Sequence, residues 1–429
     1  MAKRAQILLA FLFLLGAHPA MSFAGVGTYN ILDIGSLVPG GGNSSAYGVA
    51  YNPSSNQIYV VGAYQASQNS VYSAYLSVLD VVGSSVVPDA VNGFVTIQNP
   101  ANSSLVNNMA FSVNSSGSIA GTSWSGSANN TLDFANTTKA FTSNITSIQS
   151  GNIAQSSVVG TQNSSQGFGI NAAGTVVGQI DASGTQHAFS ASSGSYNQPT
   201  DLGTGGNTSY AQAINDSGQV VGQSNNQAAV WTNNSPAGGV ELGANGVNSW
   251  SMAKGLNDSN DIVGYGYVNA DGKETALLWD GSTVNGAPAW NQRSIGLGLN
   301  EDESYAFSIN ADGLVVGEYG SGSNDASAFI YDANTSQGYD LFSLLSSSGK
   351  DIFSSLITAA FIDELNIPVI VNAIVGDGMV NGVRHAFIAW DPSSEPAGTP
   401  TPEPGTMLLF GLGAAGAAFM RRRKVRSVS

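Results

Sequence analysis

Histidine is the side chain most often used for metal binding and proton transfer near neutral pH, and this sequence has few. Beyond residue 24 the histidines are His187 and His385, each followed by Ala-Phe. The two could form a paired metal site if the fold brought their rings together. They occupy the same place in two separate copies of a repeat, just before a predicted strand, so we expect both to be structural.

Carboxylates in turns are the second group that could do chemistry, because clustered oxygen ligands bind Ca²⁺. The turn acids are Asp181, Asp216, Asp258, Asp271 and Asp312. No D-x-D-x-D-G loop is present, and "NDSND" at 257–261 matches such a loop only in part. We therefore predict no cofactor and no metal ligands, with Ca²⁺ left open as the alternative.

A glycosidase needs two carboxyl groups held at a fixed separation. The densest acidic cluster is Glu301, Asp302 and Glu303 in "NEDES", which is typical of a solvated loop. The sequence has no nucleophile elbow, no H-E-x-x-H motif and no cysteine, and "GTGG" at 203–206 lacks the lysine of a phosphate loop. We predict no catalytic residues and no enzymatic activity, while a glycosidase or polysaccharide lyase remains the alternative.

The element that must position these side chains is a repeated phrase of nine residues. It reads "INDSGQVVG" at 214–222, with copies at 170–178, 256–264 and 309–317. An asparagine precedes a tight turn, a glycine supplies a positive φ, and β-branched residues follow, which predicts a β-hairpin. The turn residues with this structural role are Asn171, Gly174, Asn215, Gly218, Asn257, Asn310 and Gly313. The asparagines could line a ligand channel, but their recurrence with the turn favours bonds to the backbone.

A third strand follows each hairpin, for example "HAF" at 187–189 and "AAVW" at 228–231, and a short fourth strand such as "DLG" at 201–203 comes next. Such four-strand units are the size of propeller blades and must stack to bury their faces. The seven units are marked by Asn52, Asn114, Asn171, Asn215, Asn257, Asn310 and Asn366. Three tryptophans end third strands, where packing between blades is favoured over sugar stacking: Trp231, Trp279 and Trp390.

The ends of the repeat region predict a closed ring. The last unit stops at "HAFIAWD" (385–391) without a fourth strand, whereas Ile31 to Gly35 forms a fourth strand that no hairpin precedes. Pairing these two segments would remove two exposed sheet edges. We therefore predict an all-β fold over 25–391: a β-propeller of seven blades, with six or eight as the alternatives, closed by an N-terminal strand that completes the last blade.

The charge of the repeat region limits its partners. Between Arg4 and Arg421 the chain has six basic and 28 acidic residues, a formal charge of −22. A surface this acidic repels nucleic acid, so no nucleic-acid partner is expected.

Both termini have the composition of targeting segments. Residues 1–24 have a basic start, an apolar run and small residues before a cleavage site between Ala24 and Gly25, as in a secretory signal peptide. Residues 392–404 form a Pro/Ser-rich linker. Residues 405–429 contain an apolar run from Met407 to Met420, about 21 Å long as a helix, and then an arginine cluster that stays cytoplasmic by the positive-inside rule.

The C-terminal segment resembles the PEP-CTERM sorting signal of Gram-negative bacteria. The resemblance rests on the motif Pro402, Glu403 and Pro404, the apolar run, and the cluster Arg421, Arg422 and Arg423. It implies an exosortase-type membrane protease as partner, membrane association through the C-terminal helix before processing, and an extracellular or cell-surface location. It also implies a link to extracellular polysaccharide and biofilm matrix. The repeats resemble the HAF repeats of exported bacterial proteins, which carry no agreed activity.

Three functions remain open at this stage. The leading hypothesis is a non-catalytic surface or matrix protein that binds polysaccharide or other surface proteins. The second is an extracellular polysaccharide lyase or glycosidase built on a propeller. The third is a structural surface-layer component without a specific ligand.

Overall fold

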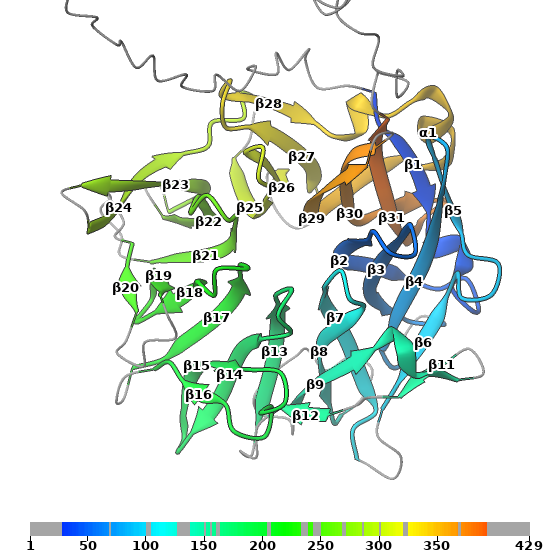
Figure 1. The fold of residues 1–429 in the computed structure, drawn as a ribbon. Coiled ribbons are helices and arrows are strands. Elements are labelled where there is room, and N and C mark those ends of the chain that lie inside the picture. The colour runs from blue at the N-terminus through cyan, green and yellow to red at the C-terminus, as the bar shows by residue number, and fades with distance from the viewer. Residues whose placement is uncertain are drawn as a thin grey trace, which may run out of the picture.

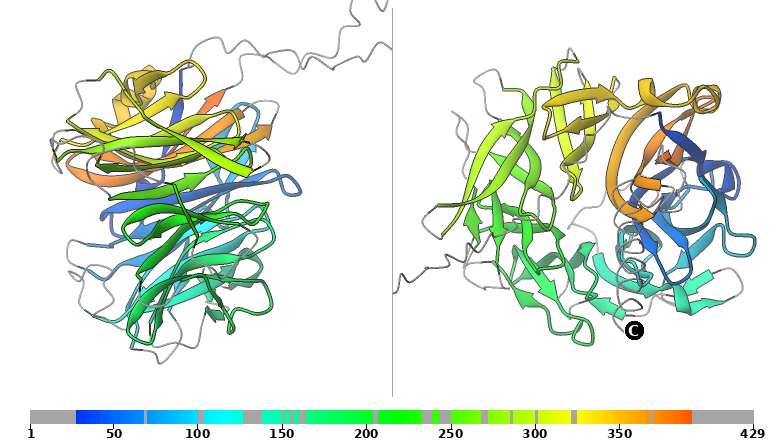
Figure 2. Two further views of the ribbon diagram at one scale, coloured as in Figure 1. Left: turned by 90° about the vertical axis from the view of Figure 1, so that its left-hand side faces the viewer. Right: turned by 45° about the horizontal axis from the view of Figure 1, so that its top comes forward.

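Seven small sheets, antiparallel except for one parallel strand pair, are arranged in a ring around a common axis in the computed structural model (Figure 1). The structure describes residues 28–392 except 68–69, 100–103, 127–137, 150–151, 155–156, 160–163, 204–206, 233–238, 243–249, 268–271, 285–286, 300–301, 321–324 and 368–369. The first strand of the hairpin of each sheet lies nearest the axis (Figure 1). Figure 2 shows the same ring from the side and tilted. The predicted seven-bladed propeller is therefore confirmed.

Blade 1 is the largest and least regular of the seven sheets. Its strands are β2 (Ser44–Asn52), β3 (Gln57–Tyr64), β4 (Ser73–Val82), β5 (Ser85–Pro88), β6 (Val95–Gln98), β10 (Ile148–Gln149) and β11 (Asn152–Ala154). Blade 2 contains β7 (Asn107–Val113), β8 (Ser118–Trp124), β9 (Thr138–Asn144) and β12 (Ser157–Val159).

Blades 3 to 6 each have four strands in simple sequential order. Blade 3 contains β13 (Ser165–Ile170), β14 (Val176–Ala182), β15 (Thr185–Ala191) and β16 (Thr200–Asp201). Blade 4 contains β17 (Ser209–Ile214), β18 (Val220–Ser224), β19 (Gln227–Trp231) and β20 (Val240–Glu241). Blade 5 contains β21 (Ser251–Leu256), β22 (Ile262–Tyr267), β23 (Glu274–Val284) and β24 (Ala287–Ser294). Blade 6 contains β25 (Glu303–Ile309), β26 (Leu314–Gly320), β27 (Ser327–Asp332) and β28 (Gln337–Asp340).

Blade 7 joins the two ends of the ring. It contains β29 (Ser355–Ile367), β30 (Ile370–Val380), β31 (Val383–Pro392) and the N-terminal β1 (Asn30–Asp33). Strand β1 pairs with β31 in antiparallel register, from Asn30 opposite Trp390 to Asp33 opposite Phe387. The predicted closure of the last blade by the first strand is therefore confirmed, and this pairing covers the edge of β31 that would otherwise be exposed.

Short helices occur in the connections between strands. The 3₁₀ helix η1 (Gly35–Leu37) follows β1, and η2 (Ile145–Ser147) follows β9. The segment between blades 6 and 7 contains η3 (Phe342–Leu344) and α1 (Ser347–Ile352), where the sequence predicts a short helix. Among the residues that the structure describes, no helix has the length and apolar composition needed to cross a bilayer.

The repeated asparagine links the hairpin of one blade to the next blade. The side-chain Oδ1 of Asn215 accepts from the backbone N–H of Gln219 at 2.9 Å, which closes the turn. Its Nδ2 donates to the backbone carbonyl of Asn257 in blade 5 at 3.2 Å. The equivalent residues make the same inter-blade bond from Asn114 to Asn171, from Asn171 to Asn215 and from Asn257 to Asn310. One buried amide per repeat therefore holds both its own turn and its neighbour.

The chain of asparagines ends differently at its two extremes. Asn310 donates to the side chain of Asn372 at 2.7 Å, so Asn372 on β30 accepts this bond. The prediction of Asn366 as the seventh marker is wrong for this reason: Asn366 lies inside β29, before the hairpin connection. In blade 1 the Nδ2 of Asn52 bonds to the hydroxyl of Tyr59 within the same blade.

The hydrophobic core is divided among the blade interfaces. One cluster joins Val177 and Ala188 of blade 3 to Val220 and Trp231 of blade 4. At the closing seam another cluster joins Ile58 and Tyr75 of blade 1 to Val375, Ile388 and Trp390 of blade 7. Each sheet thus buries its faces only against its neighbours, as expected for a repeat whose units do not fold alone.

Candidate ligand site at the ring axis

A β-bulge near the middle of each inner strand turns one side chain toward the axis. In β17 the register shifts between Ala211 and Ala213, which leaves Gln212 as the extra residue. The same shift occurs in β2, β7, β13, β21 and β25, where the extra residues are Tyr47, Phe111, Phe168, Lys254 and Phe307. Bulges are known to redirect a side chain in this way.

The glycine of the "VVG" triplet makes this bulge sterically acceptable. Gly222 pairs with Ala211 directly beside the bulge, and a Cβ on Gly222 would lie 1.8 Å from the carbonyl oxygen of Tyr210. The equivalent glycines of blades 3, 5 and 6 meet the same carbonyl at 1.8–1.9 Å. The repeat therefore encodes the bulge on one strand and the space for it on the next.

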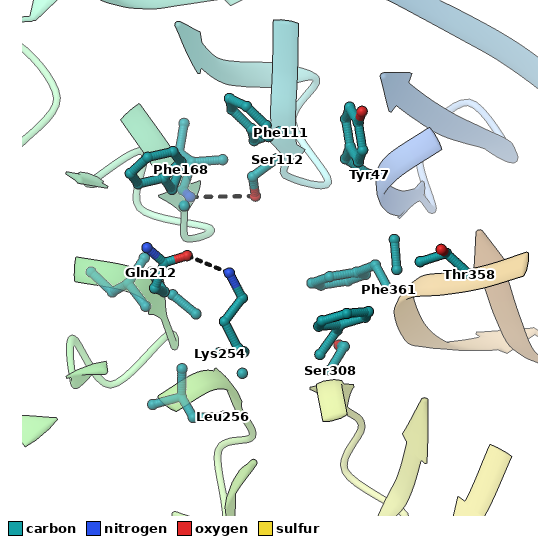
Figure 3. A pocket seen from close by; sticks show the side chains of 17 residues that line it. Tyr47, Phe111, Ser112, Phe168, Gln212, Lys254, Leu256, Ser308, Thr358 and Phe361 are labelled. Carbon is teal, nitrogen blue, oxygen red and sulfur yellow. Dashed lines mark hydrogen bonds between the residues drawn. The ribbon is translucent and has the colours of Figure 1, made fainter. Parts of the chain in front are cut away.

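The bulge residues line a cavity of about 400 Å³ at the centre of the ring (Figure 3). Aromatic rings form much of its wall. Tyr47 and Phe111 have ring centroids 5.4 Å apart, and Phe111 and Phe168 are also 5.4 Å apart. Phe361 of blade 7 lies across the cavity from Phe168 (Figure 3). This size and lining are typical of a small-molecule site.

Lys254 brings the one positive charge among the described residues that line this cavity. Its Nζ donates to Oε1 of Gln212 at 2.7 Å, a bond drawn in Figure 3. The Lys254 side chain is half-buried: protein atoms surround most of it, and the rest faces the cavity. Burial lowers the pKa of Lys254 from its usual value of 10.5 to about 8.

Two carboxyl groups lie just behind the wall at the faces of blade 7. Thr358, which lines the cavity, donates to Oε2 of Glu318 at 2.8 Å, and burial raises the pKa of Glu318. Burial also raises the pKa of Asp377 to about 6, although Arg384 opposes this shift. The Nε of Arg384 lies 3.6 Å from Oδ1 of Asp377, which is an ion pair but too long for a hydrogen bond.

The two predicted histidines are each paired with an aspartate and lie in separate blades. The Nδ1 of His187 on β15 is 2.9 Å from Asp201, and the Nδ1 of His385 on β31 is 2.9 Å from Asp33. The second pair joins the two ends of the ring. Within the described parts of the chain, no three His, Asp or Glu side chains gather in a way that could hold a metal ion.

The side chains of the turn acids Asp216 and Asp258 accept hydrogen bonds from backbone N–H groups and do not line the cavity. Oδ1 of Asp216 accepts from the N–H of Ala172, and Oδ1 of Asp258 accepts from the N–H of Asp216, so each bridges two blades. Asp302 pairs with Lys273, and Glu303 accepts from the hydroxyl of Tyr305. Asp271 and Glu301 lie outside the described residues, as do the proposed cleavage residues Ala24 and Gly25.

The three tryptophans of the third strands are buried, and two of them bond to a neighbouring blade. Only Trp231 ends its strand as predicted, whereas Trp279 and Trp390 lie inside the longer strands β23 and β31. Trp231 donates its indole N–H to the carbonyl of Leu202 in blade 3, and Trp390 donates to that of Ser84 in blade 1. Trp279 is fully buried. None of the three lines the axial cavity.

Sequence analysis did not identify the bulge residues as a site. In blades 2 to 6 they stand three positions before the anchor asparagine, in "AFSVN", "GFGIN", "AQAIN", "AKGLN" and "AFSIN". The signal was a position that reads F, F, Q, K, F while its neighbours stay small or apolar. It could be interpreted only with knowledge that the strand bulges there.

Comparison with known proteins addresses the C-terminus first. Residues 400–424 match the profile of the PEP-CTERM protein-sorting motif. The PEP-CTERM motif implies export, recognition by exosortase and a C-terminus anchored in the membrane before processing. The matched segment, with Pro402, Glu403, Pro404, Arg421, Arg422 and Arg423, lies outside the described residues. No curated protein matches the sequence.

Solved structures match the body with low similarity. Puromycin hydrolase, as the S511A mutant, is 11% identical, with a TM-score of 0.40 over 70% of this chain and 45% of the hydrolase. Trypanosoma rangeli sialidase is 11% identical, with a TM-score of 0.36 over 81% of this chain and 55% of the sialidase. The chain thus spans about half the length of these proteins, and at these values the likeness carries no argument about activity.

Proposed function

We propose that this protein is an exosortase-processed cell-surface or extracellular protein whose propeller binds a component of the polysaccharide matrix without catalysing a reaction. The observation that carries this proposal is the axial cavity. The residues that vary among the repeats meet there, whereas the asparagines and glycines that recur hold the blades together. Aromatic rings with a few polar groups are also the usual surface for binding sugar rings.

The address of the chain supports the same function. The PEP-CTERM motif implies export, and an exported body would meet the glycans of the matrix. The resemblance to HAF repeats of exported proteins agrees with this location. The acidic surface of the repeat region also disfavours extended polyanions such as nucleic acid and anionic lipid membranes as ligands.

A binding experiment on the cavity tests this function. The purified protein should be retained on an array of polysaccharides from matrix extracts. The double variant Phe111→Ala with Phe168→Ala should reduce this retention at least about tenfold, because both rings face the cavity. Tyr339→Ala on the outer strand β28 is the matched control and should keep full retention. Equal retention by the cavity variant, with an unchanged melting curve, would contradict the proposal.

A processing experiment tests the address separately. Replacing Arg421, Arg422 and Arg423 with Ser should leave the C-terminus uncut and the protein in the membrane fraction, as measured by mass spectrometry of the intact chain. Replacing Lys350, which is exposed on α1, serves as the control for loss of positive charge. Normal processing of the Arg421–Arg423 variant would show that exosortase does not read this cluster.

An enzyme is the second candidate, and one observation favours it. Asp377 is a buried and Glu318 a half-buried carboxyl group beside the cavity, and both have raised pKa values, as the acid of a glycosidase requires. If the protein turns over a matrix glycan, and Glu318→Gln and Asp377→Asn abolish this turnover, the protein is a glycosidase or lyase and the non-catalytic role is refuted. If the protein binds no glycan but assembles into ordered layers, the structural surface-layer function replaces both.

A further inference from the structure

We propose that the axial cavity binds a ring that bears a carboxylate, such as a uronic-acid residue, with the carboxylate on the Lys254 ammonium and the ring against the phenylalanine side chains. This inference rests on the proposed function for its choice of a sugar, but the argument for the carboxylate is independent of it.

Lys254 lacks a carboxylate counter-ion among the described residues. Three other basic residues of the body form ion pairs with aspartates: Lys273 with Asp302, Arg293 with Asp280 and Arg384 with Asp377. Within the described part of the chain Lys254 has no carboxylate within 4.0 Å, and its bonded partner is the neutral amide of Gln212. Charges withdrawn from water are normally paired, so a ligand anion is the natural partner for this ammonium.

The cavity lining offers several hydrogen-bond donors to a carboxylate or a sugar hydroxyl. An ammonium has three N–H donors, and the bond to Gln212 uses one of them. Because Oε1 of Gln212 accepts from Lys254, its NH₂ group is left as a further donor. Ser112 of blade 2 and Ser308 of blade 6 add hydroxyl groups at other parts of the cavity lining (Figure 3). These groups can hydrogen-bond to both oxygens of a carboxylate and to a neighbouring sugar hydroxyl.

Aromatic rings form much of the remaining wall. Phe111 and Phe168 lie on one side of the cavity, and Phe361 of blade 7 lies on the other side (Figure 3). Phe307 of blade 6 also lines the cavity. Flat apolar faces favour a ring-shaped ligand, and the cavity of about 400 Å³ accommodates a small molecule or a chain end. A neutral ring would satisfy the phenylalanines but would leave the ammonium without an anion.

The charged groups around Lys254 set the pH range in which this binding operates. Tyr47 lines the cavity, and burial raises its pKa to about 12, so it stays neutral. Glu318 and Asp377 lie behind the wall at Thr358 and Tyr47, and their pKa values are raised. Lys254 is therefore the group that titrates in mildly alkaline solution, and a carboxylate ligand should be lost as the pH rises through about 8.

The test compares an acid with its own neutral ester. Trigalacturonate and its methyl ester share the same rings, so isothermal titration of the full protein with both measures the contribution of the charge. We expect the acid to bind at least about tenfold more tightly than the ester. Lys254→Met should remove this difference, Lys254→Arg should retain most of it, and Lys350→Met, on α1, should change nothing.

Two further readouts separate binding from a loss of folding. Saturating trigalacturonate should raise the pKa of Lys254, followed by NMR of the labelled Cε, because an anion stabilises the ammonium. Melting curves of each variant show whether it is folded. Phenylacetate tests the second source of the same chemistry, a carboxylate on a ring that is not a sugar.

The outcomes distinguish this inference from the proposed function. Equal affinity for acid and ester, or undiminished binding by Lys254→Met, overturns the carboxylate site while leaving glycan binding in place. Binding of phenylacetate but not of either galacturonate form, dependent on Lys254, supports the carboxylate site and removes the matrix-glycan function. If none of the three probes binds, the carboxylate site is overturned.

Discussion

Gln212 lies on the inner strand β17 and Asn215 directly follows the end of this strand, yet the two residues belong to two different rings of side chains. Asn215 is one of a series that repeats with little change and bonds from blade to blade through its amide. Gln212 is one of a series that changes from aromatic to amide to amine and faces the axis. The comparison shows how a repeat protein can fix its framework at some positions and vary its chemistry at others.

The largest effect should come from the glycine that accommodates the bulge. Gly222→Ala would place a methyl group 1.8 Å from the carbonyl of Tyr210, so we expect a loss of more than about 4 kcal/mol in unfolding free energy. Gly218→Ala is the matched control. Gly218 has a φ of +81° in the turn with open space around it, so its loss should be about 1 kcal/mol. Denaturant unfolding measures both, and equal losses would show that the bulge does not depend on Gly222.

The framework ring should be next in sensitivity. Asn215→Ala removes the acceptor of the Gln219 N–H and one of the two donors to the buried Asn257 carbonyl, which keeps only the 3.3 Å bond from the N–H of Asn260. We expect a loss of about 2–4 kcal/mol by denaturant unfolding. Asn52→Ala, in the blade where the inter-blade bond is absent, should lose less. A larger loss at Asn52 would contradict a stabilising role for the inter-blade asparagine bonds.

Substitution of Lys254, one of the side chains that face the axis, should raise rather than lower the free energy of unfolding. The pKa of Lys254 is lowered to about 8, so holding it charged at pH 7 opposes folding. Lys254→Met should therefore stabilise the protein by about 1–3 kcal/mol at pH 7. Because the wild-type protein gains stability as the pH rises from 8 toward 10.5, the difference should shrink over that range. A destabilised Lys254→Met would mean that the ammonium is already paired in the free protein.

The smallest effect should come from the carboxyl groups of blade 7. Burial raises the pKa of Asp377 to about 6 and that of Asp363 to about 7, both from 3.8. Their contribution to stability is complete below pH 3.8 and is lost as the pH rises through these values. Asp377→Asn should therefore be about 1–2 kcal/mol more stable than wild type at pH 7.5 and equal to it near pH 3.5. Thermal melts at the two pH values check this, and a constant difference would exclude titration of Asp377 as its cause.

Much of the framework could be predicted from the sequence, because it depends on local chemistry. The pattern of Asn, Gly and β-branched residues predicts each hairpin, and the segment before the first hairpin predicts the closure that β1 and β31 form. The seventh unit was harder, because the connection near residue 368 differs from the other turns and Asn372 takes the place expected for Asn366.

The axial site could not be predicted, because it depends on geometry between distant strands. A strand of strict alternation would point Gln212 toward a neighbouring blade, and only the bulge turns it to the axis. Lys254 and Gln212 are also 42 residues apart, and the ring alone brings them into contact. The recurring "VVG" glycine was the available signal, but its meaning requires knowing which carbonyl lies opposite.

The most direct test of the division into two rings is the melting temperature of wild-type protein, Asn215→Ala and Lys254→Met, each with and without trigalacturonate. The account predicts that Asn215→Ala melts lower than wild type but keeps the full ligand-induced rise, because its axial ring is intact. It predicts that Lys254→Met melts higher than wild type and shows a smaller ligand-induced rise, because the variant binds the acid only as weakly as the ester. A ligand-induced rise in Lys254→Met equal to that of wild type, or its loss in Asn215→Ala, would contradict the separation of framework and site.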